Sequence, residues 1–199
     1  MKKYTCVFAT LVALCFTFAN ATHAQQDLPE VTLGAYYGPS KIELTGAGAL
    51  QGSVTGTGRE VGVFLQVHQG MFGLHGAFGV NSTKVDATIR RFGQQDSFTE
   101  KAGRSLDLMG MLFIEGRRIN GIGMLGFTRF ETEASGDISG GGFITGLKYA
   151  VGFDVPFPNG WVAQLAYEYA NLGELNITGT ADRYELEESG LRLRIGARY

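Results

Sequence analysis

The last nine residues of the chain, 191–199, alternate without a break between two kinds of side chain. The odd positions are apolar or aromatic, and the even positions are arginine or glycine. Because successive side chains of a β-strand leave it on opposite faces, this period of two predicts a strand. One face suits hydrocarbon, and the other carries Arg192, Arg194 and Arg198. The fold must therefore give the two faces different environments.

The N-terminus has the pattern of a secretory signal. Two lysines precede an uncharged run over residues 4–18, and residues 21–24 supply the small side chains that a signal peptidase reads. The run is shorter than the roughly 20 residues that a transmembrane helix needs. We therefore expect residues 1–24 to be a cleaved signal peptide and residues 25–199 to form a single domain.

The composition of the expected mature domain favours many strands. Both cysteines lie in the signal, so the mature domain would hold no disulfide. Removing the two lysines of the signal from the 17 basic residues leaves 15 against 19 acidic ones, a net charge of about −4. This charge predicts no nucleic-acid partner. The chain has 30 glycines and no long apolar run after the signal, which is typical of strands joined by turns.

Period-two patterns predict eight strands. They lie near residues 30–44, 57–68, 71–84, 101–115, 119–132, 141–155, 161–173 and 186–199. The short connections fall at Gln69-Gly70, 116–118 and 156–160, and the long ones at 45–56, 85–100, 133–140 and 174–185. An even number of strands with alternating short and long connections is the plan of an outer-membrane barrel. We therefore predict an all-β fold, an eight-stranded antiparallel up-and-down transmembrane β-barrel.

Most of these strands carry bulky apolar side chains on one face and glycine or charged side chains on the other. Eight strands enclose a lumen that side chains fill, so the bulky face is predicted to lie in lipid. A charge facing lipid at mid-bilayer costs roughly 2–4 kcal/mol, which places the charged residues inside. The predicted lumen charges are Lys148, Glu168, Arg192, Arg194, Asp154, Glu115 and Asp107. For the strand over 119–132, two possible turns give opposite faces, and its facing stays open.

The connection over residues 156–160 gives the inward assignment a test. If Val155 pairs with Trp161, counting back along both strands places Lys148 directly opposite Glu168. Both residues are already inward by the alternation of side chains. We expect an ion pair between them inside the barrel, with Arg192 or Arg194 nearby.

The last hairpin carries a family resemblance. The run Leu-Ala-Tyr-Glu-Tyr at residues 165–169, the pair Leu172-Gly173 and the strand over 190–199 resemble the closing hairpin of small outer-membrane β-barrel proteins. That group includes the opacity-like surface proteins and the transmembrane domain of outer membrane protein A. The resemblance implies a monomer in the bacterial outer membrane, surrounded by lipid and lipopolysaccharide. It also implies a terminal strand that the barrel assembly machinery recognises, through Leu193, Ile195, Ala197 and Tyr199.

No catalytic or metal-binding set stands out in the sequence. His68 and His75 are the two histidines outside the signal. A two-residue turn at Gln69-Gly70 would place His75 opposite Phe64, with the two histidines roughly 13 Å apart at about 3.4 Å per residue. That separation is too long for a catalytic dyad or a shared metal ion. No Ser/His/acid set lies at one rim, so we expect no enzyme activity, no cofactor and no metal.

Function in such a scaffold is expected to lie in its external loops. The candidate contact residues are Arg90, Arg91, Phe92 and Phe98, and the two arginines could reach the phosphates of lipopolysaccharide. Three hypotheses follow. The first is a non-enzymatic surface barrel with a structural, adhesive or host-interaction role, whose ligand is unknown. The second is a narrow passive channel, and the third is a soluble periplasmic barrel that binds a lipophilic ligand.

Overall fold

A computed structural model describes residues 28–46, 52–91, 94–137, 140–176 and 183–199. Its strands are β1 (Glu30–Gly46), β2 (Gly52–Gln69), β3 (Phe72–Asn81), β4 (Lys84–Arg91), β5 (Gln94–Ile114), β6 (Asn120–Gly136), β7 (Gly140–Pro156), β8 (Trp161–Asn176) and β9 (Arg183–Arg198). The expected signal peptide lies outside the described residues. Among those described, no helix is long and apolar enough to cross a membrane.

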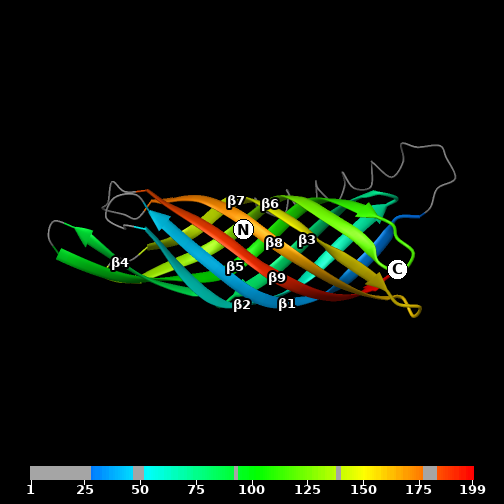
Figure 1. Ribbon diagram of the computed structural model, residues 1–199, viewed down its shortest axis with the longest axis horizontal. Coiled ribbons are helices and arrows are strands. Elements are labelled where there is room, and N and C mark those ends of the chain that lie inside the picture. The colour runs from blue at the N-terminus through cyan, green and yellow to red at the C-terminus, as the bar shows by residue number, and fades with distance from the viewer. Residues whose placement is uncertain (1–27, 47–51, 92–93, 138–139, 177–182) are drawn as a thin grey trace, which may run out of the picture.

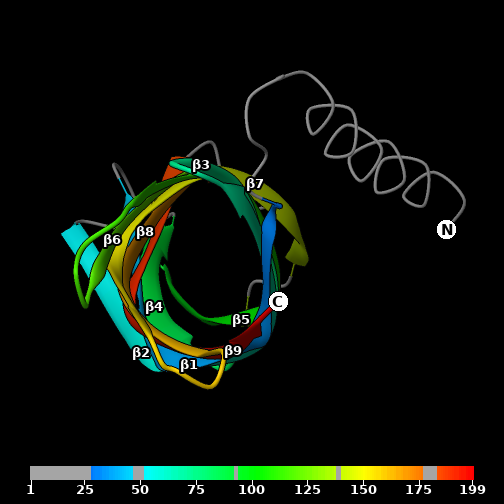
Figure 2. The same ribbon diagram turned by 90° about the vertical axis from the view of Figure 1, so that its right-hand side faces the viewer.

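The strands form one closed antiparallel sheet. Its order is β3-β2-β1-β9-β8-β7-β6-β5-β4, and pairing between β3 and β5 closes the ring (Figures 1 and 2). β3 and β4 both pair with β5, one after the other along it, and so act as a single wall strand. The fold is therefore an eight-stranded antiparallel barrel, which confirms the predicted fold class.

The third wall strand is interrupted at Ser82 and Thr83 rather than running unbroken over 71–84. The Asn81 side chain accepts hydrogen bonds from the Thr83 backbone N–H (2.9 Å) and from Thr83 Oγ1 (2.6 Å). Such a local side-chain bond competes with the sheet ladder and bends the strand. β5 adjusts with an irregularity of its own between Ala102 and Ser105.

Two registers differ from the expected ones by two positions. The turn after β2 is Gly70-Met71, with Gly70 at a φ of 57°, so His75 lies opposite Gln66 and not Phe64. After β7, the Phe157 N–H donates to the Trp161 carbonyl (2.8 Å), and the shorter turn pairs Val155 with Ala163. A shift of two keeps every side chain on its expected face, because the strand period is also two.

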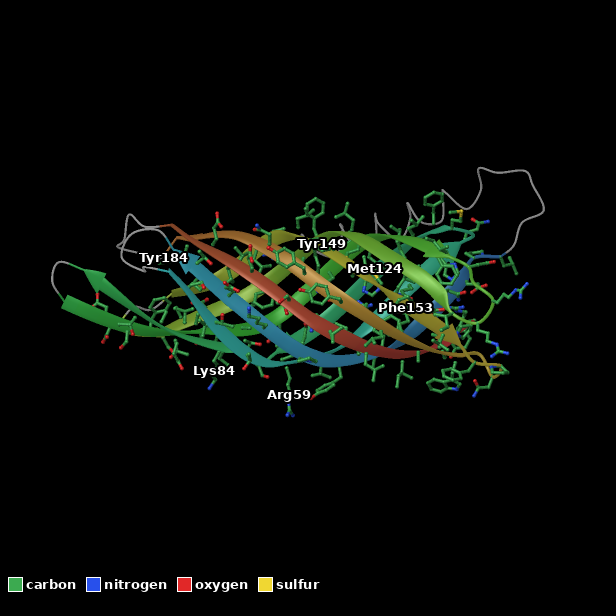
Figure 3. All side chains as sticks on the ribbon, viewed as in Figure 1. Arg59, Lys84, Met124, Tyr149, Phe153 and Tyr184 are labelled. Carbon is green, nitrogen blue, oxygen red and sulfur yellow. The ribbon has the colours of Figure 1, made fainter. Side chains whose placement is uncertain are left out.

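Large apolar side chains face outward on every wall strand. The open facing of β6 is settled by Leu125 and Phe127, which are 60% and 62% exposed, while Met124 and Phe130 point inward. Figure 3 shows outward-facing side chains along the wall, among them Tyr149 and Phe153. The outward set on the other strands includes Leu33, Val61, Val63, Leu65, Phe78, Leu106, Leu108, Leu147, Val151, Leu165, Leu191, Leu193 and Ile195.

The predicted loop over residues 85–100 is wrong: most of it is the hairpin of β4 and β5, which extends beyond the other strands (Figure 1). The physical reason is that alternate residues of this segment pack inward. Val85, Ala87 and Phe98 join a buried apolar cluster at this end of the lumen. Its other buried members are Ile42, Leu44, Ala102, Phe130, Ala170, Leu172, Tyr184 and Leu186. Toward the opposite end a second cluster holds Met109, Met111, Phe113, Ile122 and Met124, with Ala150 and Ala166.

Candidate functional site

A layer of charged side chains crosses the middle of the lumen, between the two apolar clusters. Its members come from five strands, and all are at most 3% exposed: Glu60, Asp107, Lys148, Glu168, Glu188, Arg192 and Arg194. Each occupies an inward position of its strand, opposite in parity to the outward apolar residues. We call these seven residues the lumen charge layer.

Lys148 joins two carboxylates across the lumen. Its Nζ lies 2.6 Å from Asp107 Oδ2 and 2.8 Å from Glu168 Oε2. Asp107 belongs to β5 and Lys148 to β7, so the bond reaches past β6 and ties non-adjacent strands together. The expected contact between Lys148 and Glu168 is thus present, although the cross-strand neighbour of Glu168 is Ala150 and not Lys148.

The two arginines of β9 complete the layer. Arg192 pairs with Glu60 and with Glu188 (2.9 Å), and it donates to the Pro39 carbonyl (2.7 Å). Arg194 pairs with Glu168. Arg192 Nε also lies 3.9 Å from Glu168 Oε2. Since a buried charge without a partner is expensive, this mutual pairing is what allows the charges to stay in the lumen.

Neutral polar groups from β1, β3 and β5 hold two of the carboxylates in place. Tyr36 Oη and Ser105 Oγ donate to Glu60 Oε1 at 2.9 and 2.6 Å. Ser40 Oγ and Asn81 Nδ2 donate to Glu188 Oε1, each at 2.9 Å. The layer is therefore a cross-linked network rather than a set of isolated pairs.

Two of the predicted lumen charges lie outside the lumen charge layer. Asp154 is buried but sits nearer the short-turn end, where it bonds Arg198 (2.9 Å), Asn120 (2.9 Å) and Gln164 (3.0 Å). Glu115 is exposed, because β5 ends one residue earlier at Ile114 and Glu115 belongs to the turn. Its assignment to the lumen network was wrong.

Sequence reasoning missed Glu60, Glu188 and Tyr36. The signal for the two glutamates was available, since both share the inward parity of their strands with residues already assigned to the lumen. The pattern did not show their partner, Arg192. Glu60 on β2 meets Arg192 on β9 because β1 lies between these strands and pairs with both, and Glu188 meets it from four residues away on β9.

The structure places part of the set of candidate loop residues. Arg90 and Arg91 lie on β4 opposite Gln95 and Gln94, near the tip of the hairpin, and Phe92 lies outside the described residues. Phe98 was expected to be exposed, and this was wrong. Its side chain is 3% exposed and packs inside the lumen, because it occupies an inward position of β5.

The residues of the expected assembly signal lie along the outer face of β9. Leu193 and Ile195 are about half exposed, Ala197 is half-buried and Tyr199 is 81% exposed. The Tyr199 backbone exchanges hydrogen bonds with Val31 at 2.8 and 3.1 Å. The terminal strand is thus paired along one edge with β1 and along the other with β8.

The histidines lie apart. His75 Nδ1 is 3.1 Å from the Gln66 amide nitrogen, and His68 Nε2 is 3.3 Å from Glu30 Oε2. Within the described ranges, no three His, Cys, Asp or Glu residues are arranged to hold a metal ion.

Comparison with known proteins identifies the family. The model of the outer membrane protein β-barrel domain matches residues 8–198, so the chain belongs to this family of outer-membrane barrels. Comparison with curated protein sequences finds no significant match.

Solved structures of small outer-membrane barrels are similar to this chain. The N-terminal β-barrel domain of Pseudomonas aeruginosa OprF is 11% identical, with a TM-score of 0.50 over 85% of this chain and 97% of that one. OprG from the same organism is 12% identical, with a TM-score of 0.49 over 87% and 97%. Ail, the attachment invasion locus protein of Yersinia pestis, is 16% identical, with a TM-score of 0.46 over 84% and 98%. At these identities the likeness extends to the fold alone.

Proposed function

We propose that the protein is a non-enzymatic surface barrel of the bacterial outer membrane, and that it acts by presenting the β4–β5 hairpin outside the membrane. The observation that carries this proposal is the filled lumen. The lumen charge layer, with an apolar cluster on each side of it, occupies the space that a transport or catalytic function would use. The projecting hairpin is then the part of the chain best placed to meet another molecule or cell.

The base of the hairpin is held in a defined position. It is anchored by Phe98 and Val85 in the lumen. Asp137, at the end of β6, accepts hydrogen bonds from the Ser97 N–H (2.9 Å) and Ser97 Oγ (3.2 Å). A surface element that is ordered before it binds loses less conformational entropy on binding, which favours a structural or adhesive role.

The two alternatives fit the structure less well. A passive channel would need a continuous polar path, whereas two apolar clusters and a paired charge layer lie along the lumen. A soluble carrier of a lipophilic ligand would turn its bulky face inward. Here Phe127 and Phe153, among many others, point out and are at least 60% exposed.

The test replaces only the tip of the hairpin. Exchanging residues 90–95 for a Gly/Ser linker leaves Val85, Ala87 and Phe98 in place, so the barrel should stay folded. Bacteria displaying the variant should adhere less to host epithelial cells than bacteria displaying the unchanged chain. The matched control is the same exchange at residues 47–51, between β1 and β2, which should leave adherence unchanged. Heat-modifiable migration on a gel checks the folding of both variants.

Equal adherence of the two variants would refute the role of the hairpin. Steady, reproducible conductance of the purified unchanged protein in a planar bilayer would favour the channel instead.

We also propose that the outer face of β9 is read by the barrel assembly machinery. Removing Tyr199 should lower the amount of folded barrel in the outer membrane, while refolding of the purified variant in detergent should be nearly unchanged. A variant that fails equally in both settings would indicate a purely structural role for Tyr199.

A further inference from the structure

Three basic side chains gather on the outer wall of the barrel, at the base of the β4–β5 hairpin. They are Arg59 on β2, Lys84 on β4 and Lys101 on β5, and all three are exposed. We call them the outer-wall basic patch. Lys84 and Lys101 are direct cross-strand neighbours, and Arg59 and Lys84 project from the same side of the barrel in Figure 3. Like charges directly opposite each other destabilise a sheet, so this arrangement calls for an anionic partner.

The bend after β3 places these residues together. The Ser82 hydroxyl accepts from the Arg59 N–H (3.2 Å) and donates to the Arg59 carbonyl (3.0 Å), which ties β2 to the bend. Beyond the bend β4 packs closely on β2. The approach is so close that a Cβ atom added at Gly56 would lie only 2.0 Å from the Lys84 carbonyl oxygen. The backbone of the patch is therefore fixed, while its charged side chains extend outward.

The patch differs from three other outward cations whose side chains the structure describes at this end of the barrel, because those three already have partners. Lys41 pairs with Glu43 (3.0 Å), Arg104 pairs with Glu131 through two bonds of 2.8 and 3.1 Å, and the Arg129 guanidinium lies 4.6 Å from the centre of the Phe143 ring.

The acidic groups beside the patch leave it unpaired. Asp86 accepts a hydrogen bond from Thr99 Oγ1 (2.6 Å), and Glu133 lies across from Lys101 in the β5–β6 register. Within the described parts of the chain, neither carboxylate forms an ion pair with a patch residue, and no side-chain bond neutralises Arg59, Lys84 or Lys101.

The outward apolar surface begins immediately below the patch. Val61 follows Arg59 on the same face of β2, Val80 lies directly opposite Val61 on β3, and Leu106 lies one step further along β5, opposite Phe78. Val61, Val80 and Leu106 are 50–56% exposed and face outward. A molecule lying on this part of the wall would contact apolar side chains of the barrel and, nearer the hairpin, two or three basic side chains.

From this juxtaposition we infer that the outer-wall basic patch binds the phosphate group of a membrane lipid in the leaflet on the hairpin side. The acyl chains pack on Val61, Val80 and Leu106, and the headgroup phosphate lies among Arg59, Lys84 and Lys101. Guanidinium and ammonium groups are the usual partners of phosphate oxygens. This site lies on the barrel wall and is independent of the role proposed for the hairpin tip.

Native mass spectrometry of the barrel in non-ionic detergent tests the inference, with diphosphoryl lipid A as the probe. R59Q/K84Q removes one arginine and one lysine from the patch. The matched control, K41Q/R104Q, removes the same two residue types from outward positions that already have partners. A basic residue near an anionic lipid surface contributes about 1 kcal/mol, so R59Q/K84Q should weaken lipid binding about thirtyfold. The control should change it less than about twofold.

Two further arms identify the ligand chemistry. Dephosphorylated lipid A should bind the unchanged protein and R59Q/K84Q equally, and inorganic hexametaphosphate should compete poorly for the site. Equal loss in the patch variant and its control would overturn the inference. Hexametaphosphate binding as tight as that of lipid A would overturn the lipid assignment in favour of a soluble polyanion. If R59Q/K84Q lacks heat-modifiable migration, K101Q alone is measured, with an expected loss of about fivefold.

Discussion

Lys148 Nζ and Glu168 Oε2 lie 2.8 Å apart in the middle of the lumen, and neither side chain is more than 4% exposed. Glu168 also pairs with Arg194, for which it is the one carboxylate partner among the described residues. The ion pair therefore belongs to a chain of contacts, and loss of Glu168 would leave a buried guanidinium without a counter-ion. Breaking a buried pair in this way is strongly destabilising.

We predict that Glu168→Gln lowers the free energy of unfolding by about 3–5 kcal/mol. Urea unfolding of the barrel in lipid vesicles, followed by gel mobility, measures this. Glu131→Gln is the control, because Glu131 also pairs with an arginine, Arg104, but at the exposed surface of the barrel. That variant should change stability by less than about 1 kcal/mol. Similar losses in the two variants would contradict the proposed importance of burial.

The outward face gives a second prediction. Val151 lies in the middle of the outward apolar surface of β7 and is 58% exposed, and Thr145 is exposed on the same face nearer the hairpin end. In an outer-membrane barrel, Val151→Arg should cost about 2–4 kcal/mol because the charge faces lipid at depth. Thr145→Arg should cost at most about 1 kcal/mol, since it lies close to the interface.

Vesicle refolding followed by urea titration compares these two variants. If Val151→Arg were as well tolerated as Thr145→Arg in lipid, the wall of β7 would not face the bilayer core.

For most strands the direction in which the side chains face could be predicted from sequence, because facing depends on the alternation of side chains; β6 was the exception, since two possible turns gave it opposite faces. Lys148 and Glu168 were placed inward correctly even though the register between β7 and β8 was wrong by two positions. Register depends on the turn, and the hydrogen bond from Phe157 to Trp161 that shortens it leaves no mark in the pattern. A register error of two positions leaves both side chains facing inward, so the predicted contact between Lys148 and Glu168 was still correct.

The β4–β5 hairpin could not be predicted with the same success. Its tip is polar and charged, which is typical of a loop, and the inward alternation of Val85, Ala87, Phe98 and Glu100 covers only a few residues on each side. The partners in the lumen charge layer were hidden for another reason. Arg192 and Glu60 lie on strands distant in sequence, and they meet because β1 pairs with both of these strands and not because of a local pattern.

Burial of Phe98 gives a third prediction, about local order. Phe98→Ala removes a ring that anchors the hairpin in the lumen, and the cavity left behind should destabilise this region first. Amide hydrogen exchange in β4 and the facing part of β5 should become at least about tenfold faster, while β8 and β9 keep their protection. Thr88→Ala, at an exposed position of β4, is the control and should leave exchange in the hairpin unchanged. If the hairpin exchanged at the same rate in both variants, Phe98 would not be the residue that anchors it.

The last prediction concerns Glu100, whose carboxyl group is buried and faces the lumen. Glu100 lies nearer the hairpin tip than Leu106, which is the last large apolar residue on the outer face of β5. Burial raises the pKa of Glu100 above its ordinary value of 4.5, and a hydrogen bond from Thr132 partly offsets this. The folded state therefore binds the proton more tightly than the unfolded state, so ionised Glu100 lowers stability at neutral pH. This penalty disappears as the pH falls through the raised pKa toward 4.5.

Glu100→Gln should thus stabilise the barrel near neutral pH, and its advantage should shrink as the pH is lowered, which urea titrations at a series of pH values would record. Thr132→Val removes the group that favours the ionised form, so it should destabilise the unchanged chain near neutral pH more than it destabilises Glu100→Gln. The difference between these two effects isolates the coupling of the pair. A gain from Glu100→Gln that stayed constant across the whole pH series would show that titration of this carboxyl group is not its cause.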